Sequence, residues 1–418
     1  MNRAIAPEIN TIKAVNLVFP QRLTLTDEVD LFWIDDVSDE TVKIDFIWEA
    51  GSKYQPKPLV ASFCNQLLFS GNSDISSMQI AEEIDGLGGF LSHEQNYDHA
   101  GFSLFGLNHQ IEQIFEIASN AFNSVMFPNE EVNKLREIKQ KQFELNLEKV
   151  NVRARRDFIR KTFGLNHPYG QIADKEDFDR INQKDIEKFY KDLYKTKPFI
   201  FLVGKVNDSF INQLKMWVVK FTAEKPIINF GKINQSKGQF YTEKTDALQT
   251  AIRIGRPLIN KKHADYFKFL VLNTILGGYF GSRLMSNIRE DKGYTYGIGS
   301  GVAVLEEAAY FFISTEVAKE KREETIKEIF FEINKLKTEL ISEQELGRVK
   351  NYMLGELLRN SDGAIAMMEK FKNIYFNDLK ESFYTDFIKT INSCTAEQLK
   401  TLSNKYLNDA DFTIVGYG

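Results

Sequence analysis

Cysteine is scarce in this sequence. The 418 residues include two cysteines, Cys64 and Cys394. That number is too small for a disulfide framework and too small for a zinc site built from thiolates. We therefore expect each thiol to pack as a small apolar group inside the protein.

Long apolar runs and blocks of a single charge are also absent. No stretch approaches the ~20 apolar residues of a membrane-spanning helix, and the N-terminal MNRAIAPEIN lacks the apolar run of a secretory signal. The 53 basic and 58 acidic side chains are mixed and give a net charge of −5, which favours neither nucleic acid nor a membrane as a partner. We expect a soluble cytoplasmic protein and consider a periplasmic location less favoured.

What the sequence does contain is an internal repeat. Residues 177–206 and 386–418 both begin with Asp-Phe and soon reach Ile-Asn. Both continue into an amphipathic helix and end in an apolar strand that runs into Val-Gly. The glycines that close these strands, Gly204 and Gly416, are 212 residues apart.

A second pair of segments repeats at nearly the same distance. Residues 111–140 and 321–351 each predict two successive helices, and their second helices are offset by 214 residues. Two segments with a common offset indicate duplication of the chain. Because residues 221–241 are polar and contain glycine and proline, we predict an N-terminal domain of residues 1–225, a linker of residues 226–240 and a homologous C-terminal domain of residues 241–418.

Each half combines short strands with longer helices. Alternation of apolar and polar residues predicts strands at 41–51, 97–107, 248–258 and 307–317. Helices follow the strands rather than alternating with them. We therefore predict an α+β fold in which each domain has a mixed or mostly antiparallel sheet with helices packed on one face.

Four segments give the chain its resemblance to a known family, the pitrilysin/insulinase-type zinc peptidases or inverted zincins. They are IWEAGSKYQPKPLVASFCNQLLFSGN (47–72), IDGLGGFLSHEQNYDHAGFSLFGL (84–107), NHPYGQ (166–171) and LGGYFGSRLMSNIREDKGYTYGIGSG (276–301). The resemblance covers nearly the whole chain. It implies two homologous domains arranged like a clam around a cleft.

The zinc motif of that family is missing from this sequence. The family carries H-x-x-E-H on its first helix, with two histidine ligands and a glutamate as general base. The resemblance places Ser62, Asn65 and Gln66 at those positions, and Lys141 or Gln142 at the position of the distal glutamate ligand. None of these side chains is a ligand that zinc prefers. We therefore expect no metal and no cofactor in this chain.

Two other histidines leave an alternative open. His93 and His99 are six residues apart, and we expect both on one edge strand, where an even spacing puts them on one face. The pair then forms either a metal site or two unrelated surface or half-buried side chains. His109, His167 and His263 stand alone, and we expect them to be structural or exposed.

The resemblance assigns a function to Arg289 and Tyr296. In the family, the second domain contributes an arginine and a tyrosine seven residues apart, and IREDKGYTY matches that pattern with Tyr296, not Tyr294, in register. A phenol and a guanidinium suit the stabilisation of charge that develops on a carbonyl oxygen. The alternative is that Arg289 is a cation at a helix end, near Glu290 and Asp291, and that Tyr296 is a half-buried strand residue.

Together these features predict the zinc-less subunit of a two-chain metallopeptidase, similar to mitochondrial processing peptidase. Such a chain is inactive alone. It supplies Arg289 and Tyr296 to a homologous partner that carries the zinc motif, and the pair hydrolyses an extended peptide. The alternatives are a catalytically inactive scaffold and a peptide-binding protein of the same fold, in which the strand around residues 93–102 pairs with a ligand strand.

Overall fold

The computed structural model describes residues 17–36, 40–221, 224 and 230–418. Residues 1–16, which bear on the expected absence of a secretory signal, lie outside the described residues. So do residues 225–229, where the predicted N-terminal domain ends and the predicted linker begins. Within the described part of the chain, no helix is both long enough and apolar enough to cross a membrane.

The chain divides into two compact units. Val18–Ser236 form the N-terminal unit and Lys237–Gly418 form the C-terminal unit. Part of the predicted linker belongs to each unit. In the N-terminal unit, the Ser236 N–H donates to the carbonyl of Lys161 at 2.7 Å, whereas strand β7 of the C-terminal unit begins at Gly238.

The N-terminal unit has a six-stranded sheet in the order β1-β2-β6-β3-β5-β4. Strands β2 and β6 are parallel and the other neighbours are antiparallel. The strands are β1 (Gln21–Thr26), β2 (Val29–Ile34), β3 (Thr41–Trp48), β4 (Phe90–Gln95), β5 (Ala100–Leu107) and β6 (Phe199–Val203). The helices are α1 (Val60–Gln66), α2 (Ser77–Gly86), α3 (Ile111–Asn123), α4 (Asn129–Leu147), α5 (Val150–Phe163), α6 (Lys175–Arg180), α7 (Gln183–Phe189) and α8 (Asp208–Val218), with short turns η1 (Ser52–Tyr54), η2 (Pro168–Gly170) and η3 (Tyr190–Tyr194).

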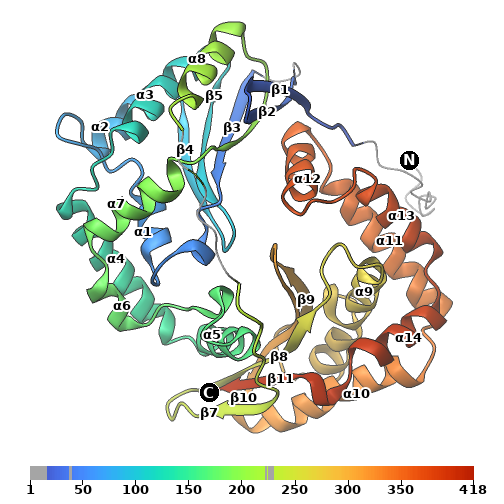
Figure 1. Ribbon diagram of the computed structural model, residues 1–418. Coiled ribbons are helices and arrows are strands. Elements are labelled where there is room, and N and C mark those ends of the chain that lie inside the picture. Colours follow the sequence, from blue (N-terminus) through green and yellow to red (C-terminus); the bar gives the residue numbers. More distant parts are fainter. Residues whose placement is uncertain (1–16, 37–39, 222–223, 225–229) are drawn as a thin grey trace, which may run out of the picture. The chain divides into compact units, whose positions relative to one another are not determined.

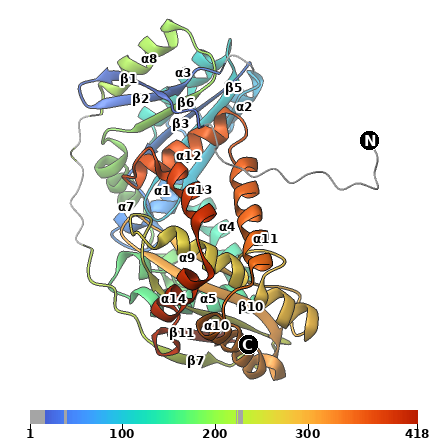
Figure 2. The same ribbon diagram turned by 90° about the vertical axis from the view of Figure 1, so that its right-hand side faces the viewer.

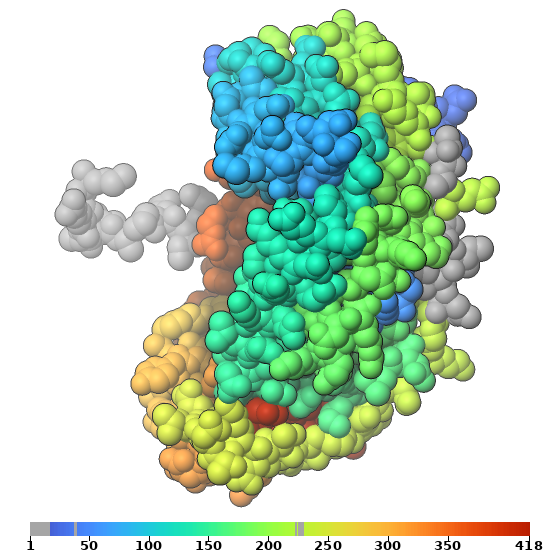
Figure 3. All heavy atoms as spheres, turned by 90° about the vertical axis from the view of Figure 1, so that its left-hand side faces the viewer, coloured from blue at the N-terminus to red at the C-terminus, as the bar shows by residue number. Residues whose placement is uncertain are grey.

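Helices cover one face of this sheet (Figure 1), and Figure 3 faces the outer side of that helical layer. Aromatic rings fill the space between the layers. Trp48, fully buried at the end of the central strand β3, stacks on Phe122 of α3 with ring centres 5.2 Å apart. Its indole N–H donates to the carbonyl of Thr196 at 3.0 Å. The core therefore ties the sheet, α3 and the chain that leads into β6 together.

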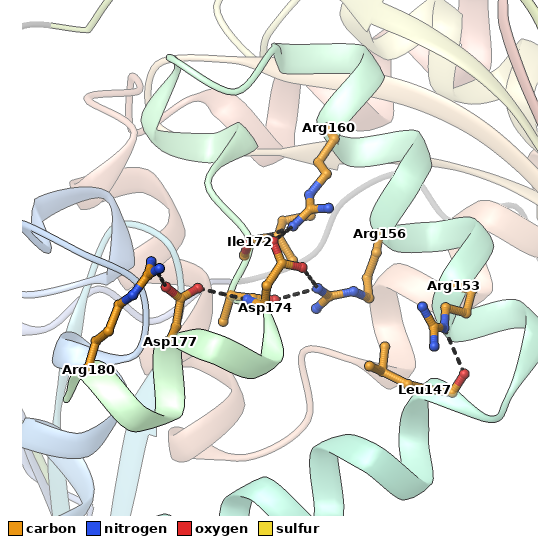
Figure 4. A network of polar contacts seen from close by, with 9 residues as sticks. Leu147, Arg153, Arg156, Arg160, Ile172, Asp174, Asp177 and Arg180 are labelled. Carbon is orange, nitrogen blue, oxygen red and sulfur yellow. Dashed lines mark hydrogen bonds and ion pairs between the residues drawn. The ribbon is translucent and has the colours of Figure 1, made fainter.

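Two arginines of α5, Arg156 and Arg160, are held by the carboxylate of Asp174 (Figure 4). Asp174, the residue before α6, accepts hydrogen bonds from Arg156 at 3.1 Å and from Arg160 at 2.6 Å. Arg160 also donates to the carbonyl of Ile172 at 3.1 Å, and Arg153 donates to the carbonyl of Leu147 at 2.9 Å. This group of basic residues thus fastens α5 to its neighbouring segments.

The C-terminal unit repeats the same plan. Its five strands follow the order β7-β11-β8-β10-β9, with β7 and β11 parallel and the other neighbours antiparallel. They are β7 (Gly238–Thr242), β8 (Gln249–Leu258), β9 (Ile298–Val304), β10 (Ala309–Ala318) and β11 (Thr413–Tyr417). The helices are α9 (Tyr266–Asn273), α10 (Arg322–Thr338), α11 (Glu343–Arg359), α12 (Ala364–Phe376), α13 (Phe383–Ser393) and α14 (Ala396–Tyr406), with η4 (Thr274–Gly278), η5 (Met285–Asp291), η6 (Lys319–Lys321) and η7 (Asp409–Asp411).

The two strand orders correspond one to one once the extra strand β1 is set aside. The parallel pair β2–β6 corresponds to β7–β11, and in each unit three antiparallel neighbours follow in the same sequence. Helix α14 precedes β11 as α7 and η3 precede β6. The predicted α+β class with two similar sheets is confirmed.

One predicted strand begins later than expected. The segment 97–107 contains β5, which starts at Ala100. The carboxamide oxygen of Asn96 accepts hydrogen bonds from the N–H groups of Asp98 at 2.7 Å and His99 at 2.8 Å. This side-chain turn ends β4 and reverses the chain before β5 begins.

Candidate functional site

Helix α1 contains Ser62, Asn65 and Gln66, the residues that the resemblance places at the zinc-motif positions. Ser62 is half-buried and its hydroxyl donates to the carbonyl of Leu59 at 3.0 Å. Asn65 is 1% exposed, and Gln66 at the end of the helix is exposed. Cys64, the residue before Asn65, is fully buried, and burial raises the pKa of its thiol well above the usual value. That thiol therefore stays protonated and packs in the core, as expected.

Asn65, which the resemblance places at the position of the general base, is a structural residue in this fold. Its amide nitrogen donates to the carbonyl of Glu94 on β4 at 3.0 Å, and its amide oxygen accepts from the hydroxyl of Tyr194 at 2.8 Å. The imidazole of His93 also bonds to the Asn65 main chain. These contacts join α1 to the edge strand β4, and an amide has no protonation equilibrium with which to act as a base.

The side chains at the motif positions do not fit a zinc ion. Lys141 and Gln142 are both exposed on α4, and an ammonium group repels a dication. A hydroxyl, two carboxamides and an ammonium lack the imidazole and carboxylate donors that zinc takes in proteins. Within the described residues there is no group of three or more His, Cys, Asp and Glu side chains that could hold a metal ion.

The structure corrects the expectation that His93 and His99 share one strand. His93 lies in β4 opposite Phe102 of β5, whereas His99 lies in the turn that follows β4. The His93 ring meets Phe69 with ring centres 5.6 Å apart, and the buried His99 ring meets Phe199 at 6.4 Å. Each imidazole thus has its own aromatic neighbour, because the Asn96 turn separates the two positions.

Arg289 lies in a π-helical segment. In η5 the Lys292 N–H donates to the carbonyl of Asn287, five residues earlier, at 3.0 Å. Such widened turns are frequent at functional sites. The chain then turns at Gly293, whose φ of +64° falls in the left-handed region that glycine adopts without strain. The η5 segment and this turn bring Arg289 back beside Tyr296.

The two residues are joined through the main chain. The Arg289 Nε–H donates to the carbonyl oxygen of Tyr296 at 3.1 Å, and a terminal nitrogen lies 3.8 Å from a carboxylate oxygen of Glu290. Tyr296 precedes β9, the edge strand of its sheet, and is 94% exposed. Among the described residues, the Tyr296 phenol forms no hydrogen bond or ring contact with another side chain.

Thr295 fixes the loop, a role that the sequence did not reveal. Its hydroxyl accepts from the N–H of Gly297 at 3.1 Å and from the hydroxyl of Thr315 at 2.9 Å. It donates to the carbonyl of Glu316 at 2.7 Å. Thr315 and Glu316 belong to β10, so these bonds attach the loop to the sheet. The exposed Tyr296 therefore stands on an immobilised stretch of backbone.

Tyr294 has the opposite environment. Its ring packs against the core of the C-terminal unit and lies under the ammonium of Lys321 at 4.9 Å. A hydrogen bond from its hydroxyl to Glu324 raises the pKa of Tyr294. The fold therefore uses Tyr294 and leaves Tyr296 available.

Phe280 is a further residue that the sequence did not single out. Its ring lies 4.7 Å from the guanidinium carbon of Arg289 and is itself 65% exposed. A cation over an aromatic face is attracted by the ring and loses some mobility. An aromatic residue in the glycine-rich segment 276–281, nine residues before the arginine, was the available signal. Phe280, Arg289 and Tyr296 form one surface, here called the Arg-Tyr surface.

The Arg-Tyr surface presents hydrogen-bond donors beside an apolar ring. The Tyr296 hydroxyl and the terminal nitrogens of Arg289 can donate to carbonyl oxygens. Such donors stabilise an oxygen on which negative charge develops, provided that they are held in place beforehand. Thr295 and Phe280 provide that restraint.

A duplicated α+β chain of this topology defines a class, the two-domain M16 peptidase fold, and the comparisons agree. Residues 32–172 match the family model described as insulinase (peptidase family M16), and residues 180–353 match the model described as peptidase M16 inactive domain. The chain belongs to the pitrilysin/insulinase-type M16 family, which confirms the resemblance found in the sequence.

Individual relatives are distant but similar in length. The uncharacterized zinc protease YmxG of Bacillus subtilis (strain 168) is 21% identical over 371 residues, which cover 86% of this chain and 88% of that protein. A crystal structure of a peptidase M16 inactive domain from Pseudomonas fluorescens has a TM-score of 0.85 at 23% identity, covering 96% of this chain and 98% of that one. A protease from Helicobacter pylori has a TM-score of 0.83 at 18% identity, covering 96% of this chain and 100% of that one. At these identities the solved structures show the fold alone.

Proposed function

We propose that this chain is the zinc-less subunit of a two-chain metallopeptidase and that the Arg-Tyr surface is its contribution to peptide hydrolysis. The observation that carries the proposal is the state of Tyr296. Its side chain is 94% exposed, yet its backbone is held by Arg289 and by the Thr295 hydrogen bonds. A fold has no need to fix a fully exposed phenol so firmly, whereas a donor to a ligand gains from being fixed.

The chemistry of α1 supports a division of labour between two chains. The relative from Bacillus subtilis is named a zinc protease, and the side chains that the resemblance places at the motif positions of this chain do not suit such a metal. A homologous partner with the zinc motif therefore supplies the metal and the attacking nucleophile. This chain supplies the phenol and the guanidinium, and it is inactive alone.

Each residue has a distinct part in the proposed reaction. The Tyr296 hydroxyl donates to the substrate carbonyl oxygen and binds it more tightly as negative charge builds up there. Arg289 holds the carbonyl of Tyr296 through Nε and keeps its terminal nitrogens for neighbouring carbonyls of an extended peptide. Phe280 lies against the guanidinium and gives a substrate side chain an apolar surface.

Reconstitution tests the proposal. This chain should be mixed with a zinc-motif chain of the same family from the same organism, and hydrolysis of a fluorogenic peptide should be followed. Hydrolysis that neither chain shows alone is the expected result. If the zinc-motif chain is equally active without this one, or if the mixture remains inactive towards a broad peptide library, the proposal is wrong.

A peptide-binding role without hydrolysis is the second candidate, and one feature favours it. Strand β4 is at the edge of its sheet, and the Asn65 contact fixes its backbone at Glu94. An exposed edge strand can accept an extended peptide as an additional strand. In that case the chain binds peptides alone, and Tyr296→Phe leaves both binding and any partner's activity unchanged.

A further inference from the structure

The C-terminal unit contains a cavity that the proposed function does not use. Its volume is about 370 Å³ and it lies between the β8–α9 connection and helices α9, α11, α12 and α13. Figures 1 and 2 both show these helices grouped together. Cavities that bind small organic molecules usually measure ~300–1,000 Å³, so the space is large enough for a small ligand.

Aromatic and aliphatic side chains form most of the cavity wall. Phe267 of α9 contacts Phe383 and Phe387 of α13, with ring centres 4.8 Å and 5.5 Å apart. Leu270 and Leu357 also line the space. This wall offers a ligand an apolar surface whose burial contributes to binding in proportion to area.

The polar groups of the cavity are mainly hydrogen-bond donors. Lys261 donates to the carboxamide oxygen of Asn373, and the Asn373 amide nitrogen donates to the hydroxyl of Tyr384 at 2.9 Å. The ammonium of Lys370 lies 5.1 Å from the centre of the Tyr384 ring. Tyr266 also lines the space and carries a further hydroxyl donor.

No anion balances the two lysines. Within the described residues, no carboxylate forms an ion pair with Lys261 or Lys370. Glu356, the acidic residue of the wall, is engaged by Arg359. By contrast Lys262, the next residue in the chain, pairs with Asp378 at 2.8 Å. These two half-buried cations therefore lack the anionic partner that a buried charge ordinarily has, although Lys261 donates to the Asn373 carboxamide oxygen.

We propose that this cavity binds a small apolar carboxylate, with the carboxylate against Lys261 and Lys370 and the apolar body against Phe267, Phe383 and Phe387. Two lysines and two phenols supply the donors that a carboxylate accepts. The aromatic wall selects a ligand that carries a phenyl or short alkyl group. The ligand can be a free acid or the C-terminal residue of a peptide, since both present the same chemistry.

The charge state of the lysines gives the proposal a pH signature. Burial lowers the pKa of Lys261 to about 8, and it lowers the pKa of Lys370 as well. Burial raises the pKa of Tyr266 to about 12, with a contribution from Tyr384, whose own pKa is raised by burial. Near pH 8 it is therefore Lys261 that loses the positive charge a carboxylate ligand needs. Affinity should therefore fall as the pH rises, by about tenfold between pH 7 and pH 9 for Lys261 alone.

The test is calorimetric titration of the full chain with 3-phenylpropionate and, as a neutral analogue, 3-phenylpropionamide. The acid should bind at least about tenfold more tightly than the amide at pH 7 and lose this advantage at pH 9. Lys261→Met should weaken binding of the acid by about tenfold or more, and so should Lys370→Met. Lys262→Met is the matched control and should bind like the unchanged chain.

Further arms identify the source of the ligand. An N-acetylated tripeptide that ends in phenylalanine is compared with the same peptide amidated at its C-terminus. Preference for the free C-terminus indicates a peptide ligand, and binding of the small acid alone indicates a free carboxylate. The proposal is overturned if acid and amide bind equally, if neither binds, or if Lys261→Met and Lys370→Met retain full affinity while their thermal unfolding matches that of Lys262→Met.

Discussion

Replacing Tyr296 with phenylalanine removes a single hydroxyl and keeps the shape of the ring. Tyr296 is 94% exposed, and its phenol forms no hydrogen bond or ring contact with another side chain among the described residues. The midpoint of thermal unfolding should therefore change by less than ~2 °C. Arg289 bonds the carbonyl of residue 296, and Thr295 holds the backbone, so the loop keeps its position. Any loss of activity then reports the hydroxyl alone.

The expected loss follows from the role of a single donor. A fixed donor that meets developing charge in a site closed to water is worth about 10²–10³ in turnover. If water can reach the carbonyl and replace the phenol, the loss shrinks to roughly tenfold, because water is itself a donor. We therefore expect kcat of the reconstituted pair to fall between about tenfold and a thousandfold, with KM nearly unchanged.

Steady-state hydrolysis of a fluorogenic peptide by the reconstituted pair is the assay. Tyr294→Phe is the control, because Tyr294 bonds Glu324 within the fold and should not reach substrate. Thr295→Val should also lower kcat by releasing the loop, and Thr295→Ser should restore it, since serine keeps the hydroxyl. If Tyr296→Phe retains the activity of the unchanged chain, the Arg-Tyr surface carries no chemistry and a scaffold role is correct.

Three further predictions concern the fold and the former zinc site. The purified and dialysed chain should contain no stoichiometric zinc by elemental analysis. One tightly held ion per chain would contradict the conclusion that the side chains at the motif positions do not fit zinc. Asn65→Ala should lower the free energy of unfolding by about 2–4 kcal/mol in urea titrations, because it leaves the hydroxyl of Tyr194 and the carbonyl of Glu94 without partners; an effect near zero would show that α1 and β4 are joined otherwise. Gly51→Ala should destabilise the N-terminal unit, since its Cβ would stand 2.3 Å from the carbonyl oxygen of Tyr97. A thermal midpoint equal to that of the unchanged chain would refute this close approach.

The duplicated sheet could be predicted because its signal is local. Strands β3, β8 and β10 coincide with alternating segments of the sequence to within three residues at either end. The repeat offset also identified β6 and β11 as equivalent strands of the two halves. Those patterns arise from burial on the faces of a sheet, which each strand records in its own residues. The family resemblance extended the prediction of an α+β fold to both units.

The site depended on contacts that are distant in the sequence. Thr295 acts through Thr315 and Glu316, twenty or more residues away, and no local pattern marks it. The expectation that His93 and His99 share a strand failed because the Asn96 side chain makes the turn, although asparagine followed two residues later by aspartate was a usable turn signal. The cavity near Lys261 requires residues of α9, α11, α12 and α13, which only the fold brings together.

The contrast between Asn65 and Tyr296 supports the proposal that the C-terminal unit contributes the chemistry of this chain. The resemblance places Asn65 at the position of the family's general base, but both ends of its amide are bonded and the residue is 1% exposed. Glutamate at this position would bury a carboxylate against the carbonyl of Glu94, so restoring the family residue should destabilise the unit rather than create a base. Tyr296 is in the reverse situation, because the fold holds its backbone and makes no use of its hydroxyl. A side chain that the fold positions but does not bond can donate to a substrate. For this reason we place the proposed activity in the C-terminal unit, which contains Tyr296.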